Sequence, residues 1–151
     1  MTDTDFPVVA VRGRSGSGKT SLIGRIVKKL ATQGSQVIVI KHSTKATPSI
    51  DPKGKDTAKH LEAGASLVVG SFAQSTFFFL GASMALEKIL RVCRKLGDWD
   101  LCLIEGHYLE PFPNIVLKTK DVNEHTIANA AEEPFEFIIE KLQNLIPKGK
   151  S

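Results

Sequence analysis

The chain has 151 residues, of which 42% are hydrophobic and 24% are charged, a balance that excludes a disordered chain and indicates a globular protein. Its 20 Lys and Arg residues against 16 Asp and Glu residues give a net charge of +4, which suits an anionic ligand. This excess is too small and too scattered to indicate a nucleic-acid partner. The length is that of one domain, so we expect a single domain over residues 1–151.

Cysteine usage and hydropathy indicate the cellular compartment. Cys93 and Cys102 are too few for a disulfide framework, form no C-x-x-C pair and fall on apolar faces, which predicts inert buried thiols. No apolar run approaches the roughly 18 residues that span a bilayer, and residues 1–5 are too polar and acidic for a secretory signal. We therefore expect a reduced, cytoplasmic protein with no membrane partner.

The first predicted elements are a strand, a helix and a second strand. The continuous apolar run 8–11 predicts a buried strand. Apolar residues at helical spacing between Leu22 and Leu30 predict an amphipathic helix that ends near Gly34. The β-branched run 37–40 is typical of a strand that is covered on both faces, as in a parallel sheet. Together these elements predict a βαβ unit.

The rest of the chain continues the alternation of strands and helices. Residues 42–54 carry Pro48, Pro52 and Gly54 with little periodicity, which predicts a long surface loop. The further elements that we expect are helices over 55–63, 86–96 and 135–145 and strands over 67–69, 76–80, 101–104 and 115–117. The aromatic run Phe77–Phe79 predicts either core packing or a subunit interface. The alternation predicts a three-layer α/β domain with a mainly parallel sheet.

A phosphate-binding motif follows the first predicted strand. Residues 13–20, GRSGSGKT, match the P-loop pattern G-x-x-x-x-G-K-[ST], whose glycines let backbone N–H groups and the start of the helix face phosphate oxygens. Lys19 would reach the β- and γ-phosphates, and the Thr20 hydroxyl would hold Mg²⁺. The expected fold is therefore a P-loop NTPase domain. The predicted nucleotide-binding residues are Gly13, Arg14, Ser15, Gly16, Ser17, Gly18, Lys19, Thr20 and Ser21.

An acidic residue ends the predicted strand 101–104. P-loop proteins need such a carboxylate to order the water shell of Mg²⁺ or to orient a water molecule. We therefore predict Glu105 as a metal residue beside Thr20, and as a catalytic residue with Lys19. A surface carboxylate at a strand end stays the alternative for Glu105. Asp100 is the poorer candidate because it lies at the opposite end of the strand.

Further polar residues are expected near the same edge of the sheet. Lys41 and His42 end the second predicted strand, and ligands bind at the carboxyl edge of parallel strands. Both are candidates for contact with a phosphate or a substrate, unless they face solvent. The segment 51–57 mixes acids and cations: Asp51 or Asp56 is a candidate to bind Mg²⁺ or a substrate, while Asp56 is equally suited to cap the following helix. The candidates in this segment for a substrate or cofactor are Asp51, Lys55 and Asp56.

These segments together resemble the MobB family, small P-loop proteins of molybdopterin-guanine dinucleotide synthesis. The resemblance covers residues 7–118 and depends on four segments in this order: GRSGSGKTSLIGRIV, VIVIKH, IDPKGKDTAKHLEAGAS and DLCLIEGH. It implies a homodimer that binds GTP with Mg²⁺ and hydrolyses it weakly, beside the MobA guanylyltransferase, which joins GMP to the molybdopterin cofactor. It also implies that Lys41, His42 and the segment 51–57 lie near the cofactor site.

Guanine specificity follows from the resemblance alone. A G-protein recognises its base with an N/T-K-x-D segment, whose aspartate accepts hydrogen bonds from guanine N1 and N2. Thr119-Lys120-Asp121-Val122 has the wrong spacing, and Asn129-Ala130-Ala131 says little about the base.

The residues leave several alternatives open. In related dimeric P-loop proteins a lysine at the position of Arg14 reaches the partner's phosphates, so Arg14 is a candidate transition-state cation, unless it points to water. A small-molecule kinase would use the same loop to transfer the γ-phosphoryl group, although the sequence shows no arginine-rich lid. A scaffold would bind nucleotide without turnover.

Overall fold

The chain forms two compact units. The computed structural model describes residues 5–43, 55–106 and 111–148. Contacts within the chain group residues 1–43 with 90–151 as one unit and residues 44–89 as the other. The expectation of one domain over the whole chain stays a prediction.

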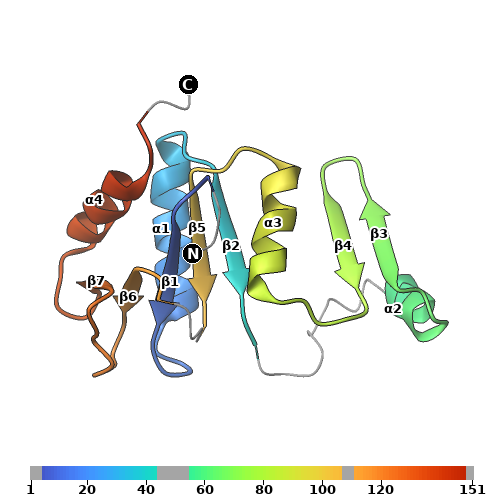
Figure 1. The fold of residues 1–151 in the computed structure, drawn as a ribbon, viewed down its shortest axis with the longest axis horizontal. Coiled ribbons are helices and arrows are strands. Elements are labelled where there is room, and N and C mark those ends of the chain that lie inside the picture. Colours follow the sequence, from blue (N-terminus) through green and yellow to red (C-terminus); the bar gives the residue numbers. More distant parts are fainter. Residues whose placement is uncertain (1–4, 44–54, 107–110, 149–151) are drawn as a thin grey trace. The chain divides into compact units, whose positions relative to one another are not determined.

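A five-stranded parallel sheet forms the centre of the first unit (Figure 1). Its strands are β1 (Val8–Arg12), β2 (Val37–Lys41), β5 (Leu101–Glu105), β6 (Asn114–Val116) and β7 (Thr126–Asn129), in the spatial order β2-β5-β1-β6-β7. Each neighbouring pair of strands is parallel. The carboxyl end of β1 therefore lies between those of β5 and β6, and the predicted three-layer α/β fold with a mainly parallel sheet is confirmed.

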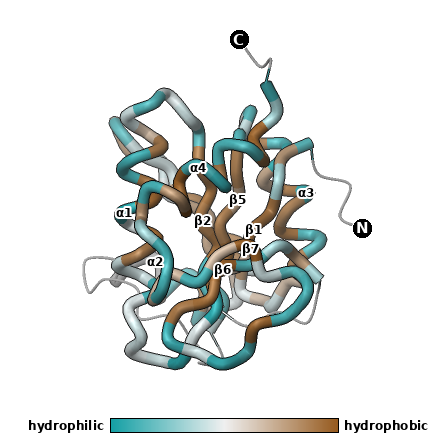
Figure 2. Tube along the Cα trace, turned by 90° about the vertical axis from the view of Figure 1, so that its left-hand side faces the viewer, coloured by the Kyte–Doolittle hydropathy of each residue, from teal (hydrophilic) through white to brown (hydrophobic). Residues whose placement is uncertain are grey.

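Helices cover both faces of this sheet. They are α1 (Lys19–Thr32), α4 (Phe135–Leu145) and the part of α3 (Leu86–Leu96) that begins at Leu90. Figure 2 shows α1 and α3 on opposite sides of β1 and β5, with hydrophobic strands between them. Because both faces are covered, all five residues of β5 are buried.

One apolar cluster holds the sheet to the helices of one face. Val9 and Leu103 of the sheet pack in it with Ile26 and Leu30 of α1 and with Leu142 of α4, and all five side chains are 0% exposed. The cluster fixes α1 against the end of β1. It thereby fixes the loop that joins the two elements.

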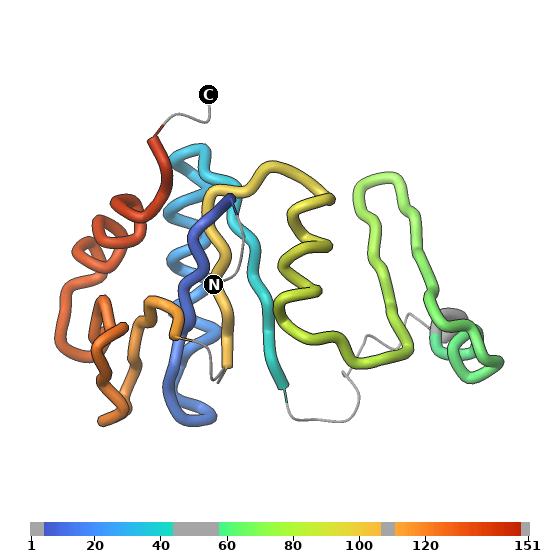
Figure 3. The backbone as a smooth tube through the Cα atoms, viewed as in Figure 1, coloured from blue at the N-terminus to red at the C-terminus, as the bar shows by residue number. Residues whose placement is uncertain are grey.

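The second unit contains α2 (Lys55–Glu62) and an antiparallel hairpin of β3 (Leu67–Ser71) and β4 (Thr76–Leu80) (Figure 3). The N–H of Phe72 donates to the carbonyl oxygen of Ser75 at 2.8 Å and closes the turn. Phe77 is 38% exposed and Phe78 is 57% exposed. Core packing was therefore the wrong interpretation for these two aromatic residues, and a subunit interface stays a prediction.

The remaining predicted elements are confirmed, with small shifts at their ends. The predicted strand 67–69 extends to Ser71, and the predicted strand 115–117 is displaced by one residue in β6. The sequence did not predict β7, in which only Ala128 is buried. Most of the predicted loop 42–54 lies outside the described residues. None of the helices that the structure describes is long and apolar enough to span a membrane.

Candidate nucleotide-binding site

The predicted P-loop joins β1 to α1 at the carboxyl edge of the sheet. Gly18, the residue before the helix, has φ 99°, a left-handed conformation that favours glycine. Gly13 packs against the main chain after β6, and a Cβ atom at this position would clash with the carbonyl oxygen of Leu117. The two glycines thus allow the sharp turn and the close approach that the loop needs.

The first turn of α1 is open to an anion. It has no acidic residue and no side-chain cap, whereas the first turns of α3 and α4 carry Glu87 and Glu136. The N–H groups of a first helical turn have no partners within the helix and carry partial positive charge. A phosphate group would satisfy these N–H groups at the start of α1.

Two polar side chains of the loop fit a phosphate. The Lys19 ammonium donates to the carbonyl oxygens of Gly13 at 2.8 Å and Arg14 at 2.7 Å, which holds it across the loop. The buried Ser17 hydroxyl has no hydrogen-bond partner among the described residues. Buried hydroxyl groups are rarely left without a partner, so this donor is suited to a phosphate oxygen. The residues present therefore fit a phosphate chain.

The predicted metal residues meet beside the loop. The Thr20 hydroxyl donates to the Glu105 carboxylate at 2.6 Å, although 85 residues separate the two in the sequence. Glu105 is only 9% exposed, and Nζ of Lys41 lies 3.8 Å from the same carboxylate oxygen, Oε1. A hydroxyl and a carboxylate are oxygen ligands of the kind that Mg²⁺ binds directly or through water. The pair therefore fits Mg²⁺ carried by nucleotide phosphates.

No larger ligand set for a metal exists in the part of the chain that the structure describes: it has no group of three or more His, Cys, Asp or Glu side chains placed around one ion. A metal bound between Thr20 and Glu105 would need further oxygen ligands from phosphates and water. This arrangement suits Mg²⁺, which keeps several waters and often binds with phosphates.

The ends of β2 and β5 lie side by side, as the sequence predicts for Lys41 and His42. Lys41 pairs with Glu105 in the register of the two strands, and the His42 N–H donates to the Glu105 carbonyl oxygen at 2.8 Å. A Cβ atom at Gly106 would lie 2.9 Å from that of His42. Both predicted residues thus lie at the same edge of the sheet as the P-loop.

The other three predicted substrate residues stay untested. Asp51 lies outside the described residues. Lys55 and Asp56 begin α2 in the second unit, and their side chains also lie outside the described part. Their roles stay predictions.

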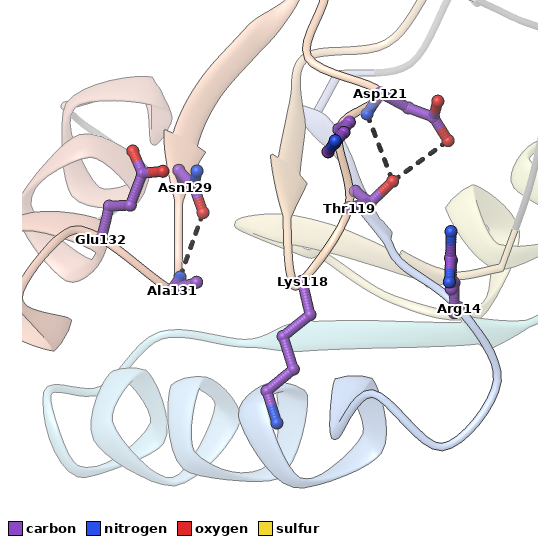
Figure 4. Close-up of a pocket in the computed structure, with 8 residues that line it drawn as sticks. Arg14, Lys118, Thr119, Asp121, Asn129, Ala131 and Glu132 are labelled. Carbon is purple, nitrogen blue, oxygen red and sulfur yellow. Dashed lines mark hydrogen bonds between the residues drawn. The ribbon is translucent and has the colours of Figure 1, made fainter.

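The sequence missed a second feature of this edge, a pocket of about 480 Å³ on the other side of the P-loop. Arg14 lines it together with residues 118–121 after β6, with Asn129 at the end of β7, and with Ala131 and Glu132 after β7 (Figure 4). The two segments meet because β6 and β7 are neighbours. The pocket could have been found only by predicting β7.

Comparisons with known proteins identify the family of this chain. The sequence model of the MobB family, molybdopterin guanine dinucleotide synthesis protein B, matches residues 8–139. The chain belongs to the MobB family. It is 30% identical over 144 residues to the molybdopterin-guanine dinucleotide biosynthesis adapter protein of Haemophilus influenzae, a match that covers 89% of this chain and 79% of that protein.

Other MobB proteins agree in sequence and in fold. The chain is 32% identical over 113 residues to the probable molybdopterin-guanine dinucleotide biosynthesis adapter protein of Bacillus subtilis, which covers 74% of this chain and 65% of that protein. The crystal structure of Bacillus subtilis MobB superposes with a TM-score of 0.76 at 22% identity, over 95% of this chain and 100% of that chain. The MobB fold is therefore shared along most of the chain.

Proposed function

We propose that this MobB-family chain is a GTP-binding, weakly GTP-hydrolysing adapter protein in molybdopterin-guanine dinucleotide biosynthesis, and that it acts beside a MobA-type guanylyltransferase. The observation that supports this best is the convergence of Lys19, Thr20 and Glu105 at the open N-terminus of α1. The adapter role is supported by the relatives in Haemophilus influenzae and Bacillus subtilis, which are named as an adapter protein and a probable adapter protein of this biosynthesis.

The loop residues would bind the phosphate chain of the nucleotide. The first-turn N–H groups of α1 and the Ser17 hydroxyl would donate to phosphate oxygens, and Lys19 would exchange its two carbonyl partners for the β- and γ-phosphates. Bound Mg²⁺ would offset negative charge on these phosphates. The Thr20 hydroxyl and Glu105 would hold the ion and its water in place.

Weak hydrolysis agrees with the exposure of Arg14 in a single chain. Phosphoryl transfer depends on positioned cations, and an arginine placed on the transferred group accelerates it by about 10³–10⁵-fold. An arginine that faces solvent gives no such acceleration. Arg14 stays a candidate for this role across a homodimer.

The homodimer belongs to the same proposal, and the hairpin of the second unit is its candidate surface. Leu67, Val69, Phe78 and Leu80 of the hairpin are 40–57% exposed. A two-stranded hairpin is marginally stable alone, and clustered exposed apolar residues typically mark a protein interface. A second copy of the chain would cover them.

Lys41 and His42 are the candidate contacts for the molybdopterin cofactor. They lie beside Glu105, next to the proposed position of the terminal phosphate, and the Lys41 side chain is 64% exposed. A cation here would hold an anionic cofactor next to the nucleotide and so bring the two reactants together. The proposed adapter role would then consist of presenting cofactor and nucleotide to the transferase.

The experiment follows phosphate release and molybdopterin-guanine dinucleotide formation with Mg·GTP, with and without the transferase. We expect slow release by the chain alone and faster dinucleotide formation by the transferase when the chain is added. Lys19→Ala should abolish both effects, whereas Lys28→Ala, an exposed lysine of the same helix, should keep both. Stimulation of the transferase by Lys19→Ala would contradict a nucleotide-dependent adapter. Selective transfer of the ATP γ-phosphoryl group to a small acceptor would favour the kinase alternative.

A further inference from the structure

The pocket beside Arg14 lies on the side of the P-loop opposite Glu105. The sheet order places β5, with Glu105 and the Thr20 contact, on one side of β1 and β6 on the other. A nucleotide whose phosphates occupy the loop has its terminal phosphate and metal on the β5 side. Its nucleoside then leaves the loop on the β6 side, where the pocket begins.

The main chain after β6 is bent toward the loop. The N–H of Leu117 donates to the carbonyl oxygen of Arg12 at 2.9 Å, and Gly13 packs against the Leu117 carbonyl. The next residue, Lys118, has φ 51° and is the one non-glycine residue with positive φ in the described ranges. Such a conformation is strained for lysine and is frequent at ligand sites. It turns residues 119–121 alongside the P-loop.

The carboxylate of Asp121 is held in position inside this turn. The Thr119 hydroxyl donates to Oδ2 of Asp121 at 3.1 Å, and its oxygen accepts the Asp121 N–H at 3.2 Å (Figure 4). Arg14 rises toward the same pair in the figure. A second turn closes the far side of the pocket, where Oδ1 of Asn129 accepts the Ala131 N–H at 3.1 Å.

The size and the lining of the pocket suit a purine nucleoside. Pockets for small ligands typically have volumes of about 300–1,000 Å³, and this one has about 480 Å³. Lys118 and Lys120 bring long methylene chains that can cover the flat faces of a base, while their ammonium groups stay in water. Asp121 supplies an oriented acceptor at the edge.

We infer that this pocket binds the guanine base of the proposed GTP, and that Asp121 is the residue that selects guanine over adenine. The inference rests on the proposed function. The guanine edge presents two adjacent donors, N1–H and the 2-amino group, which one carboxylate can accept together. Adenine presents the acceptor N1 at that place, so a carboxylate repels it. Asp121 therefore favours guanine through both attraction and repulsion.

The test measures equilibrium binding of the full chain with Mg²⁺ to GTP, ITP, XTP, ATP and inorganic triphosphate, which has no base. Because a hydrogen bond to a charged group changes affinity by about 10- to 100-fold, wild type should bind ATP weaker than GTP by that factor. ITP lacks the 2-amino group and should bind about 10-fold weaker than GTP.

Substitution of Asp121 should change the preferred base and leave phosphate binding alone. Asp121→Asn should bind GTP about 10- to 100-fold weaker, and should bind XTP better than wild type does, because the amide can donate to the 2-oxo group of xanthine. Its affinity for inorganic triphosphate should not change. Asp98→Asn, an exposed aspartate outside the pocket, is the matched control and should behave as wild type.

Three results would overturn the inference. Equal affinity of wild type for GTP, ITP and ATP would leave nucleotide binding intact and remove base recognition, and this result needs no variant that might misfold. An equal loss of GTP and triphosphate binding in Asp121→Asn would assign the residue a structural role. Failure of wild type to bind any of these compounds would overturn the proposed function together with the pocket.

Discussion

The parallel sheet and the β3–β4 hairpin are built from similar apolar sequences but differ in burial. In β5, LCLIE, every residue is buried, whereas in β4, TFFFL, four of the five residues are more than a third exposed, among them Phe78 and Leu80. Helices cover the sheet on both faces, and nothing within the described residues covers these hairpin side chains to the same degree. An apolar run therefore predicts a strand, and the neighbouring elements decide whether it belongs to a core or to an interface.

The two regions also differ in their relation to the candidate site. The carboxyl edge of the sheet carries the P-loop, Lys41 and Glu105, and the pocket after β6 and β7. The hairpin carries no part of that described site. We therefore expect substitutions in the sheet to change folding and nucleotide binding, and substitutions in the hairpin to change association.

The largest expected effect is on stability. Leu103→Ala removes a side chain that is 0% exposed and should lower the free energy of unfolding by about 2–5 kcal/mol. Phe78→Ala, at a 57% exposed position, should lower it by less than about 1 kcal/mol in the monomer. Urea unfolding followed by circular dichroism measures both. Equal losses would contradict the difference in burial on which the comparison depends.

The next effect is on metal-dependent nucleotide binding at the edge of the sheet. Thr20→Val removes the hydroxyl that donates to Glu105 and should weaken Mg·GTP binding by about 10- to 100-fold, the usual cost of losing a metal-site contact. Thr20→Ser keeps a hydroxyl and should keep most of the affinity. Titration of each variant with GTP, in the presence and in the absence of Mg²⁺, separates the contribution of the metal from that of the phosphate contacts. A similar loss in Thr20→Ser, or in Phe78→Ala, would contradict a specific role for the hydroxyl.

Association should respond to the hairpin instead. Phe78→Ser should raise the dissociation constant of the proposed homodimer by about 5-fold or more, because buried aromatic anchors contribute over ~1 kcal/mol to interfaces. Phe137→Ser is the matched control, since Phe137 is 55% exposed on α4 of the first unit. Light scattering over a concentration series measures the constant. A wild-type chain that stays monomeric over the whole concentration series would contradict the hairpin as a dimer interface.

The smallest expected effect is a pH-dependent one next to the pocket. The hydrogen bond from Lys141 and the N–H of Asn129, which donates at 2.9 Å, hold the pKa of Glu133 below its ordinary value of 4.5. A carboxyl group with a lowered pKa in the folded state stabilises that state at pH values above its ordinary pKa. This stability is lost as the pH falls through the lowered pKa. Glu133→Gln should therefore cost about 0.2–1 kcal/mol at neutral pH.

This cost should disappear in acid. Thermal unfolding of wild type and Glu133→Gln between pH 7 and pH 3 measures it, and the two curves should converge below the ordinary glutamate pKa of 4.5. Glu132→Gln, an exposed neighbour, controls for the change in net charge. A difference that persists undiminished in acid would show that Glu133 acts through packing and not through its charge.

The sequence predicted those parts of the fold that depend on local pattern. The strands around Val9 and Leu103 were predictable because both faces of a parallel sheet are buried and their sequences are continuously apolar. The placement of Glu105 beside Thr20 was predictable because parallel strands bring their carboxyl ends to one edge. The apolar pattern and the direction of the strands were enough to place these residues.

The parts that were missed depend on tertiary context. The β7 sequence, TIAN, is short and mixed in polarity, and only Ala128 in it is buried, so no period marks it as a strand. Without β7 the segments that contain Asp121 and Asn129 have no reason to meet, and the pocket between them stays hidden. The exposure of Phe78 was equally invisible, because an aromatic run looks the same in a core and at an interface.

Calorimetric titration of the full chain with Mg·GTP tests the central claim most directly, that residues 13–20 bind the phosphate chain of a nucleoside triphosphate. Wild type and Lys28→Ala should show saturable binding of one nucleotide per chain. Lys19→Ala should bind about 100-fold weaker, because the charged hydrogen bonds of one lysine to phosphates contribute ~1.5–3 kcal/mol. Equal affinity in Lys19→Ala, or no heat with any purine triphosphate in wild type, would contradict the claim.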